Sequence, residues 1–176
     1  RVDLNVPVKD GKVLDDTRIL ATIPTLQYLQ KQNSKIVLIS HFGRPEAGVF
    51  DSKFSLLPVA KRLAEILNME IPLFASTDEV DFNADISLLE NIRFLSGELT
   101  NDLDLSRKLS DLADVYVFDA FGTSHRAHSS MVGINAKVKA AGYLLNKELN
   151  YFSKILDKPE RPVLVILGGA KVHDKI

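Results

Sequence analysis

The sequence predicts an α/β protein with a mostly parallel sheet and helices on both faces, a three-layer, Rossmann-like arrangement. Three observations support this prediction. Short apolar runs alternate along the chain with segments whose apolar residues recur every three or four positions. The clearest runs are apolar on both faces, as in sheets that helices cover on both sides. The composition is that of a globular protein, with 45% hydrophobic and 26% charged residues in a chain of 176.

The candidate strands are short and rich in β-branched or aromatic residues. They span residues 2–6, 35–40, 71–74, 86–89, 115–118 and 162–167. We interpret residues 2–6 as the tail of a strand whose start is missing, and the runs at 71–74 and 86–89 give the weaker signals. Asp10 and Gly11, between Val8 and Val13, predict a small hairpin after the first strand.

The candidate helices show amphipathic spacing. They span residues 18–30, 57–67, 103–112 and 142–156. Ser55 is the expected N-cap of the second helix, and Asn101-Asp102 precede the third in a cap-like position. Pro24 is acceptable in the first helix only near its first turn, where backbone N–H groups lack partners.

Charge, cysteine content and hydropathy exclude several function classes. Lys and Arg number 22 against 23 Asp and Glu, so the chain as a whole is not built to bind nucleic acid or an anionic membrane. The absence of cysteine removes disulfides, thiol catalysis and cysteine-based metal sites. No apolar run approaches the ~20 residues of a membrane span. A cytoplasmic enzyme is the simplest interpretation.

Basic residues gather in the loops that follow the predicted strands. All 4 histidines lie there, together with Arg44, Arg93 and Arg126. Ligands of open parallel sheets bind beyond the carboxyl ends of the strands. Because the planar guanidinium suits carboxylate and phosphate oxygens, these loops predict a cationic site for a small molecule with more than one negative charge.

Each of these residues also has an ordinary interpretation. Arg44 can be an exposed loop charge, Arg93 can pair with Glu90, and the histidines can be solvated. Four basic loops on the same side of one sheet favour an anion-binding site, because scattered surface charge would not gather there. Asp3 and Asn5 share a strand face and belong with these loops, whereas Asp119 can simply brace a neighbouring loop and receives no site role.

Residues 168–171, Gly-Gly-Ala-Lys, follow a predicted strand and open a helix, so their backbone N–H groups could face a phosphate. They match neither the Walker A pattern nor the G-x-G-x-x-G pattern of dinucleotide sites. Taken alone, they are equally typical of a tight strand-to-helix turn.

Taken together, five blocks resemble the phosphoglycerate kinase family, in family order and from the first residue to the last. They are residues 1–7 (RVDLNVP), 40–45 (SHFGRP), 89–94 (LENIRF), 122–130 (GTSHRAHSS) and 168–176 (GGAKVHDKI). The resemblance implies a monomeric, cytoplasmic, glycolytic kinase with two α/β domains that close about a hinge. One domain binds 3-phosphoglycerate or 1,3-bisphosphoglycerate, and the other binds Mg-ADP or Mg-ATP.

The resemblance also implies a division of this chain. Residues 1–141 would be the phosphoglycerate-binding domain, residues 142–158 the interdomain helix and linker, and residues 159–176 the beginning of the nucleotide-binding domain. The rest of that domain would be absent, so the chain would be a truncated two-domain kinase. On this basis we expect no tight nucleotide binding and little or no activity from the chain alone, and we predict no metal ligand in it.

Site residues carry over by position. The family's phosphoglycerate-binding positions correspond to Asp3, Asn5, Arg18, His41, Arg44, Arg93 and Arg126. Arg18 also corresponds to the arginine credited with stabilising the transferring phosphoryl group. Lys171, the second catalytic candidate, and Lys175 correspond to lysines on the nucleotide side, and Gly169 belongs to the phosphate-facing loop.

Other functions remain open from the residues alone. The same loops could serve a non-catalytic anion sensor, which needs no second domain. A dinucleotide-dependent oxidoreductase could use a similar sheet, although the missing G-x-G-x-x-G pattern argues against it. A structural module could assemble through the apolar stripe of residues 142–156, although the polar linker after it favours an interdomain brace.

Overall fold

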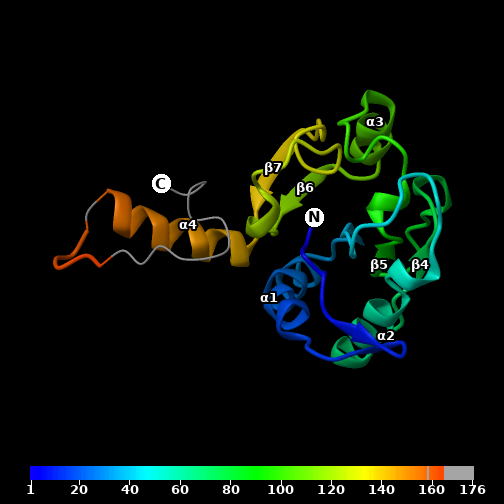
Figure 1. The fold of residues 1–176 in the computed structure, drawn as a ribbon, viewed down its shortest axis with the longest axis horizontal. Coiled ribbons are helices and arrows are strands. Elements are labelled where there is room, and N and C mark those ends of the chain that lie inside the picture. Colours follow the sequence, from blue (N-terminus) through cyan, green and yellow to red (C-terminus); the bar gives the residue numbers. More distant parts are fainter. Residues whose placement is uncertain (158, 165–176) are drawn as a thin grey trace. The chain divides into compact units, whose positions relative to one another are not determined.

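The computed structural model describes residues 1–157 and 159–164 (Figure 1). The chain divides into two compact units, residues 1–146 and residues 147–176. The first unit holds every strand and three complete helices of the described chain. None of the helices in the described ranges is long and apolar enough to cross a membrane.

A three-stranded parallel sheet forms in the order β3-β5-β4. Its strands are β3 (Ile36–Leu38), β4 (Leu73–Phe74) and β5 (Ile86–Leu89). All residues of the central strand β5 are buried, as expected for a parallel strand covered on both faces. These strands confirm the predictions at 35–40, 71–74 and 86–89.

Two smaller sheets complete the strand inventory of the described residues. Strands β6 (Val115–Phe118) and β7 (Val138–Ala141) pair in parallel, and β1 (Val8–Lys9) pairs antiparallel with β2 (Lys12–Val13). The hairpin prediction is therefore confirmed. Strand β7 was not predicted. The predicted strand at 2–6 is reduced to one parallel bridge between Val2 and Asp119.

In the described part of the chain, four α-helices lie at the predicted places and four short 3-10 helices lie in the loops. The helices are α1 (Thr17–Lys31), α2 (Leu57–Leu67), α3 (Leu103–Asp111) and α4 (Tyr143–Leu156). The 3-10 helices are η1 (Ser52–Phe54), η2 (Thr77–Glu79), η3 (Ile92–Phe94) and η4 (Phe121–Thr123). The α/β class with a parallel sheet and flanking helices is confirmed.

Two local predictions about helices were wrong. Pro24 lies in the interior of α1, well past the first turn, so the helix lacks one backbone hydrogen bond there. Ser55 is not the N-cap of α2, because Leu56 occupies that position. The Ser55 hydroxyl still accepts a hydrogen bond from the backbone N–H of Leu57 at 3.1 Å. Asp102 caps α3 as expected, accepting from the backbone N–H of two first-turn residues.

The buried core anchors the loops that follow the strands. One cluster joins α1 and α2 to the sheet through residues such as Leu26, Leu63 and Leu88. A second cluster contains Ile39 and Ile92, which precede the two loops at residues 40–45 and 93–95. Each loop therefore leaves a buried apolar residue, which fixes the point from which its polar side chains project.

The predicted strand at 162–167 is not seen in its described part, since residues 162–164 have no regular secondary structure. Its remaining residues lie outside the described ranges, as do Gly169, Lys171, Lys175 and the fourth histidine, His173.

Candidate anion-binding site

Four arginines from separate loops share one neighbourhood, and we call Arg1, Arg44, Arg93 and Arg126 the arginine cluster. Burial lowers the pKa of Arg93, and the charges of Arg126, Arg1 and Arg44 lower it further. Arg126, Arg1 and Arg44 therefore each lie within electrostatic reach of the Arg93 guanidinium. The cluster joins the chain start, the loop after β3, the loop after β5 and the loop after β6.

Asn91 ties two of these loops together. Its side-chain oxygen accepts from the backbone N–H of Phe42 at 3.1 Å and of Arg93 at 3.2 Å. Its side-chain nitrogen donates to the carbonyl oxygens of Phe42 at 2.7 Å and Phe54 at 2.9 Å. Because Asn91 is almost fully buried, these bonds hold Arg93 against the loop after β3. Sequence reasoning assigned Asn91 no role.

Gly43 is hydrogen-bonded to two predicted site residues, Asn5 and Arg93. Its N–H donates to the Asn5 side-chain oxygen at 3.0 Å, and its carbonyl oxygen accepts from the Arg93 guanidinium. The backbone of Gly43 has φ +59, and an added Cβ would overlap the ring of Phe54. Only glycine fits this position without strain, so the loop that carries His41 and Arg44 depends on it.

Arg18 lies at the edge of the site, paired with Asp3. The Arg18 Nη1 and Asp3 Oδ2 atoms are 2.7 Å apart, and the Arg18 side chain is 55% exposed. The other oxygen of Asp3 accepts from the backbone N–H of Asn5 at 3.2 Å. Asp3 connects Arg18 to the cluster, because its charge raises the otherwise lowered pKa of Arg1. Arg18 therefore stands beside the cluster with most of its donors facing solvent.

His41 is a neutral member of the site. Burial, followed by the charges of Arg1, Arg93 and Arg126, lowers its pKa to about 3. Its Nδ1 lies 3.2 Å from a guanidinium nitrogen of Arg1, which can only donate, so Nδ1 accepts. At neutral pH the positive charge of the site therefore comes from arginines and not from His41.

We expect the depressed pKa of His41 to make the fold acid-sensitive. The unfolded chain binds a proton at His41 below its ordinary pKa of 6.5, whereas the native chain binds it only near pH 3. The contribution of His41 to stability is therefore complete above pH 6.5 and is lost as the pH falls toward 3, by up to about 5 kcal/mol. In His41→Gln the amide oxygen can still accept from Arg1, so urea unfolding between pH 6.5 and 3 should depend less on pH. If the unfolding free energies of the parent and the variant changed with pH in the same way, this role of His41 would be contradicted.

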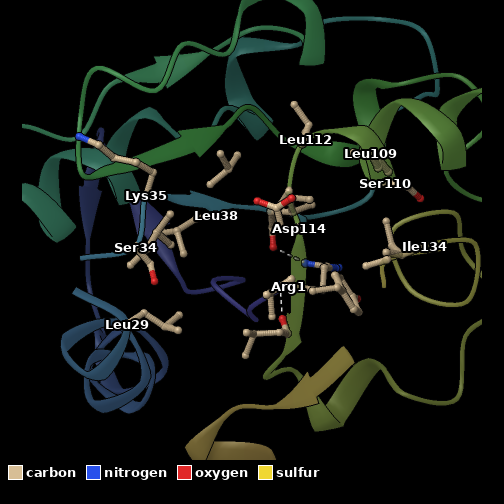
Figure 2. Close-up of a pocket in the computed structure, with 18 of the residues that line it drawn as sticks. Arg1, Leu29, Ser34, Lys35, Leu38, Leu109, Ser110, Leu112, Asp114 and Ile134 are labelled. Atoms are coloured by element: carbon tan, nitrogen blue, oxygen red, sulfur yellow. Dashed lines mark hydrogen bonds between the residues drawn. The ribbon is translucent and has the colours of Figure 1, made fainter. Parts of the chain in front are cut away.

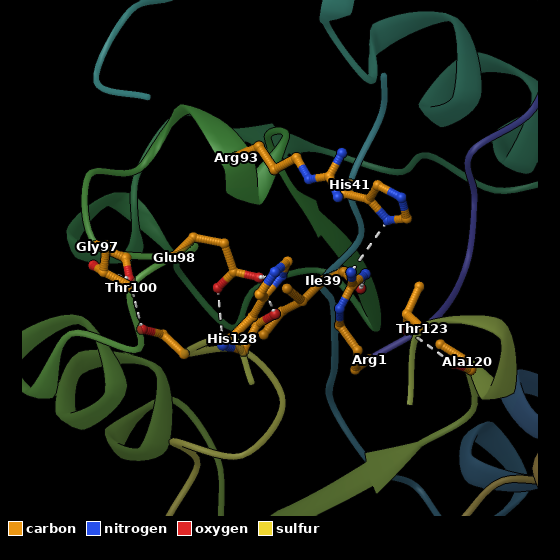
Figure 3. A network of polar contacts seen from close by, with 12 residues as sticks. Arg1, Ile39, His41, Arg93, Gly97, Glu98, Thr100, Ala120, Thr123 and His128 are labelled. Carbon is orange, nitrogen blue, oxygen red and sulfur yellow. Dashed lines mark hydrogen bonds and ion pairs between the residues drawn. The ribbon is translucent and has the colours of Figure 1, made fainter. Parts of the chain in front are cut away.

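A buried carboxylate supports the loop after β6 (Figure 3). Glu98 accepts from the Ser130 backbone N–H at 2.9 Å and from the Ser130 hydroxyl at 2.6 Å. His128 Nδ1 lies 3.5 Å from the same carboxylate. Burial raises the pKa of Glu98, while Ser130, Arg1 and Arg93 oppose this shift. Glu98 thus links the segment after η3 to the loop that carries Arg126.

Sequence reasoning missed Arg1 and Glu98 as members of this neighbourhood. The guanidinium of Arg1 is buried and donates to the carbonyl oxygens of Val2 at 2.7 Å and Ile39 at 3.1 Å. Figure 3 shows Arg1 reaching toward His41 from the opposite side to Arg93. Arg1 lies in the sequence block at residues 1–7, and its position two residues before Asp3 was the one available signal.

The alternative pairing of Arg93 with Glu90 is wrong. Glu90 accepts from the hydroxyl of Ser55 and the backbone N–H groups of Leu56 and Asn91, each at 2.7 Å. It braces the start of α2 instead. The interpretation of Asp119 as a brace agrees with the structure, since its carboxylate accepts from Thr25 Oγ1 at 2.6 Å and from the backbone N–H of Leu145 at 2.9 Å.

The cluster carries more positive than negative charge. Asp3 and Glu98 are the acidic groups whose charges act on Arg1, against four arginines in the cluster and Arg18 beside it. The Nε atoms of Arg1 and Arg93 are buried and have no hydrogen-bond partner within the described residues. A small polyanion would offset this repulsion, and guanidinium forks are suited to bind it.

The structure thus brings together five predicted residues, namely Asn5, His41, Arg44, Arg93 and Arg126, and places Asp3 and Arg18 at their edge. Gly169, Lys171 and Lys175 lie outside the described residues. Within residues 1–157 and 159–164, no group of three or more His, Asp or Glu side chains could hold a metal ion.

Comparisons with known proteins give one consistent result. The family model described as phosphoglycerate kinase matches residues 1–176. The phosphoglycerate kinase of Desulfovibrio desulfuricans is 50% identical over 179 residues, covering 100% of this chain and 46% of its own length. That of Fervidobacterium nodosum is 46% identical over 185 residues, with the same two coverages, 100% and 46%.

Comparison with solved structures points to the same family. The phosphoglycerate kinase from Coxiella burnetii superposes with a TM-score of 0.92 at 41% identity, covering 99% of this chain and 46% of that one. The enzyme from Pyrococcus horikoshii gives 0.81 at 31% identity. The chain therefore spans about half the length of the relatives it matches.

Proposed function

The chain belongs to the phosphoglycerate kinase family, and we propose that its arginine cluster binds 3-phosphoglycerate or 1,3-bisphosphoglycerate. The observation that carries this proposal is that the charges of Arg126, Arg1 and Arg44 all act on the Arg93 guanidinium, which donates to the Gly43 carbonyl oxygen. A ligand with a phosphate at one end and a carboxylate or acyl phosphate at the other supplies two anionic groups to a site with several guanidinium forks. Each fork can bind a carboxylate or phosphate in two-point fashion.

We propose the same division of the chain into domains that the family resemblance implies. Residues 1–141 form the phosphoglycerate-binding domain, residues 142–158 the interdomain helix and linker, and residues 159–176 the first part of a nucleotide-binding domain. The brace between Asp119 and the N–H of Leu145 supports a rigid junction between the loop after β6 and the start of α4.

The proposed reaction is reversible transfer of the acyl phosphate of 1,3-bisphosphoglycerate to ADP, which gives 3-phosphoglycerate and ATP. Both acceptor groups, a carboxylate and a nucleotide phosphate, are anions at pH 7, so no general base is required. His41, which stays neutral at this pH, fits a hydrogen-bonding role in such a site. Catalysis then depends on alignment and on cancelling charge at the equatorial phosphoryl oxygens.

Arg18 is our candidate for that charge cancellation. Its ion pair with Asp3 uses one Nη atom at 2.7 Å, and the exposed remainder can meet a phosphoryl group beside the cluster. Asp3 then acts as a positioning residue that aims the guanidinium. The roles of three further residues are carried over from the family by sequence position alone. Lys171 would cancel phosphoryl charge from the nucleotide side, and Lys175 and Gly169 would contact the nucleotide.

A magnesium-bound nucleotide would supply the phosphate acceptor and neutralise its charge. The described residues offer no group of acidic or histidine side chains for the ion, and the proposal assigns none of them to it. A cytoplasmic location, expected from the sequence, stays a prediction.

Binding of 3-phosphoglycerate to the 176-residue chain is the direct test. We expect amide shifts in an NMR titration to concentrate at Gly43, Arg93 and Arg126, and we expect the affinity to fall with salt. Inorganic phosphate should bind more weakly, because it occupies one end of the site only. Shifts scattered over the surface, or equal affinity for phosphate, would contradict the proposal. Nicotinamide dinucleotide binding would favour the oxidoreductase alternative instead.

Turnover separates the kinase proposal from an anion sensor. The chain spans 46% of its relatives' length, so we expect it to bind phosphoglycerate while making only traces of ATP from 1,3-bisphosphoglycerate and ADP. Activity should appear in a chain that also carries the remaining length of a relative. If such a chain bound phosphoglycerate and stayed inactive, the sensor hypothesis would be favoured.

A further inference from the structure

The hairpin of β1 and β2 turns on an Asp-Gly pair, Asp10-Gly11, which occurs once in the sequence. The ladder pairs Lys9 with Lys12 and so leaves Asp10 and Gly11 as a two-residue turn. Both have positive φ, 51 for Asp10 and 71 for Gly11, as a type I′ turn requires. The proposed phosphoglycerate function does not use this turn.

The side chain of Asp10 and the N–H of Gly11 are both free to react. Within residues 1–157 and 159–164, neither group makes a hydrogen bond. Both residues are exposed, and no atom lies within 4 Å of the position that a Cβ of Gly11 would take. The carboxyl carbon of Asp10 is therefore accessible to the nitrogen of the next residue, and no Cβ hinders that nitrogen.

Two comparable pairs, in which serine follows an aspartate or an asparagine, are held in place. The Asp51 side chain accepts from the backbone N–H of Lys53 at 2.9 Å. The N–H of Ser34, the residue after Asn33, donates to the carbonyl oxygen of Leu29 at 3.2 Å. Figure 2 shows Ser34 and Leu29 among the residues that line one groove. In each pair, one of the two groups that would have to react is already hydrogen-bonded.

The hairpin turn can open without unfolding the core. Strands β1 and β2 have 2 residues each, and a two-stranded hairpin is only marginally stable by itself. Val8 and Val13 pack against the larger core cluster, whereas the turn residues do not belong to it. Local opening of so small a unit costs much less free energy than global unfolding. Asp10 can therefore leave its turn conformation while the rest of the chain stays folded.

We propose that Asp10-Gly11 is a site of spontaneous isomerisation, at which Asp10 becomes isoaspartate. The Gly11 nitrogen attacks the side-chain carboxyl carbon of Asp10 and forms a C–N bond. The carboxyl hydroxyl leaves as water, together with the proton of the N–H, and a succinimide ring remains. Water then adds to the main-chain carbonyl carbon of Asp10 and breaks the bond from that carbon to the Gly11 nitrogen, which takes up a proton. The chain now runs through the Asp10 β-carbon, and its mass is unchanged.

Isoaspartate would disrupt the inner rung of the hairpin. The main chain gains a methylene group inside the turn, and the register of a hairpin depends on the length of its turn. The pairing of Lys9 with Lys12 should therefore be lost. The outer pair, Val8 with Val13, should remain, because both side chains pack against the core.

Ageing of the 176-residue chain in mildly acidic buffer tests this proposal, because the carboxyl oxygen leaves as water from the protonated acid. Peptide mapping detects isoaspartate as a product of unchanged mass and altered elution that resists a protease specific for aspartate. We expect isoaspartate to form at Asp10 at least ~10-fold faster than at Asp51, which corresponds to a barrier lower by about 1.4 kcal/mol. Equal rates at Asp10 and Asp51 would overturn the proposal.

Gly11→Asn is the matched control, because asparagine tolerates positive φ and its Cβ would meet open space. Its side chain hinders the attacking nitrogen, so isoaspartate at Asp10 should form at least ~10-fold more slowly. NMR contacts between Lys9 and Lys12 should persist in this variant during ageing and fade in the parent. Equal isomerisation in parent and variant would contradict the role of Gly11.

Asp10→Asn gives a second readout through mass. Ammonia then leaves in place of water, so the chain gains the mass difference between an amide and an acid. We expect this change at position 10 at least ~10-fold sooner than at Asn33, where the N–H of Ser34 is hydrogen-bonded. If the amide at position 10 lasted as long as that of Asn33, the folded turn would be blocking ring closure and the proposal would be wrong.

Discussion

Replacing Arg126 by alanine is expected to weaken binding of 3-phosphoglycerate about 10- to 100-fold while changing the unfolding free energy by less than about 0.5 kcal/mol. The reason is that the Arg126 charge acts on Arg93, His41 and His128. In contrast to Arg93, whose guanidinium holds Gly43, Arg126 adds repulsion to the unliganded site. Calorimetric titration at low salt, together with urea unfolding, measures both quantities.

Arg107→Ala is the matched control, because it removes the same charge from an exposed position on α3. The Arg107 side chain is 72% exposed and lies 3.3 Å from Asp104. It should leave phosphoglycerate affinity within about twofold. If Arg107→Ala weakened binding as much as Arg126→Ala, the ligand would be responding to net charge and the assignment of Arg126 to the site would be wrong.

A second measurement on Arg126→Ala needs no ligand. Burial lowers the pKa of His128, and Arg93 and Arg126 lower it further. Removing Arg126 should therefore move the pKa of His128 upward, toward its ordinary value of 6.5. NMR titration of the histidine ring protons reports this shift. An unchanged His128 titration would show that Arg126 points away from the cluster.

Much of the fold could be predicted, because strands and helices of this chain have different apolar spacings. Strand β3 illustrates this, since its three residues are all apolar and two of them are buried. Strand β7 was missed because its residues Val138–Ala141 are all exposed, so no buried face marks it in the sequence. Its pairing with β6 depends on backbone hydrogen bonds, which carry no side-chain signature.

Pro24 shows a different limit of predicting structure from sequence. A proline in a helix interior is disfavoured by local chemistry, yet α1 continues through it from Thr17 to Lys31. The neighbouring residues Ile19 and Leu26 are buried in the core. Tertiary burial therefore outweighs the lost hydrogen bond, which sequence spacing alone could not decide.

The site could be predicted where its residues carry charge and follow strands. Arg93 and Arg126 were found in this way, because the carboxyl ends of parallel strands meet at one edge. Asn91 and Glu98 were missed because they act through backbone groups and buried hydrogen bonds. Such partners are set by the tertiary fold, and a lone Asn or Glu in a loop gives no sign of them.

Gly142→Ala is expected to destabilise the fold by about 3 kcal/mol at pH 7. An added Cβ would come within 3.0 Å of three atoms of the Asp119 carboxylate. That carboxylate is 0% exposed and is held by Thr25 and by the N–H of Leu145. It cannot move aside without leaving buried donors unpaired. Urea unfolding at pH 7 measures the loss.

Gly122→Ala provides the matched control, since the nearest atom to its added Cβ is Asp3 Oδ2 at 3.9 Å, an ordinary contact. It should cost less than about 1 kcal/mol. A double-mutant cycle then isolates the cause. In an Asp119→Ala background the carboxylate is gone, so adding Gly142→Ala should cost little more than Asp119→Ala alone. If the cost of Gly142→Ala were the same in both backgrounds, backbone conformation and not the carboxylate would require the glycine, and Asp119 would not brace the start of α4.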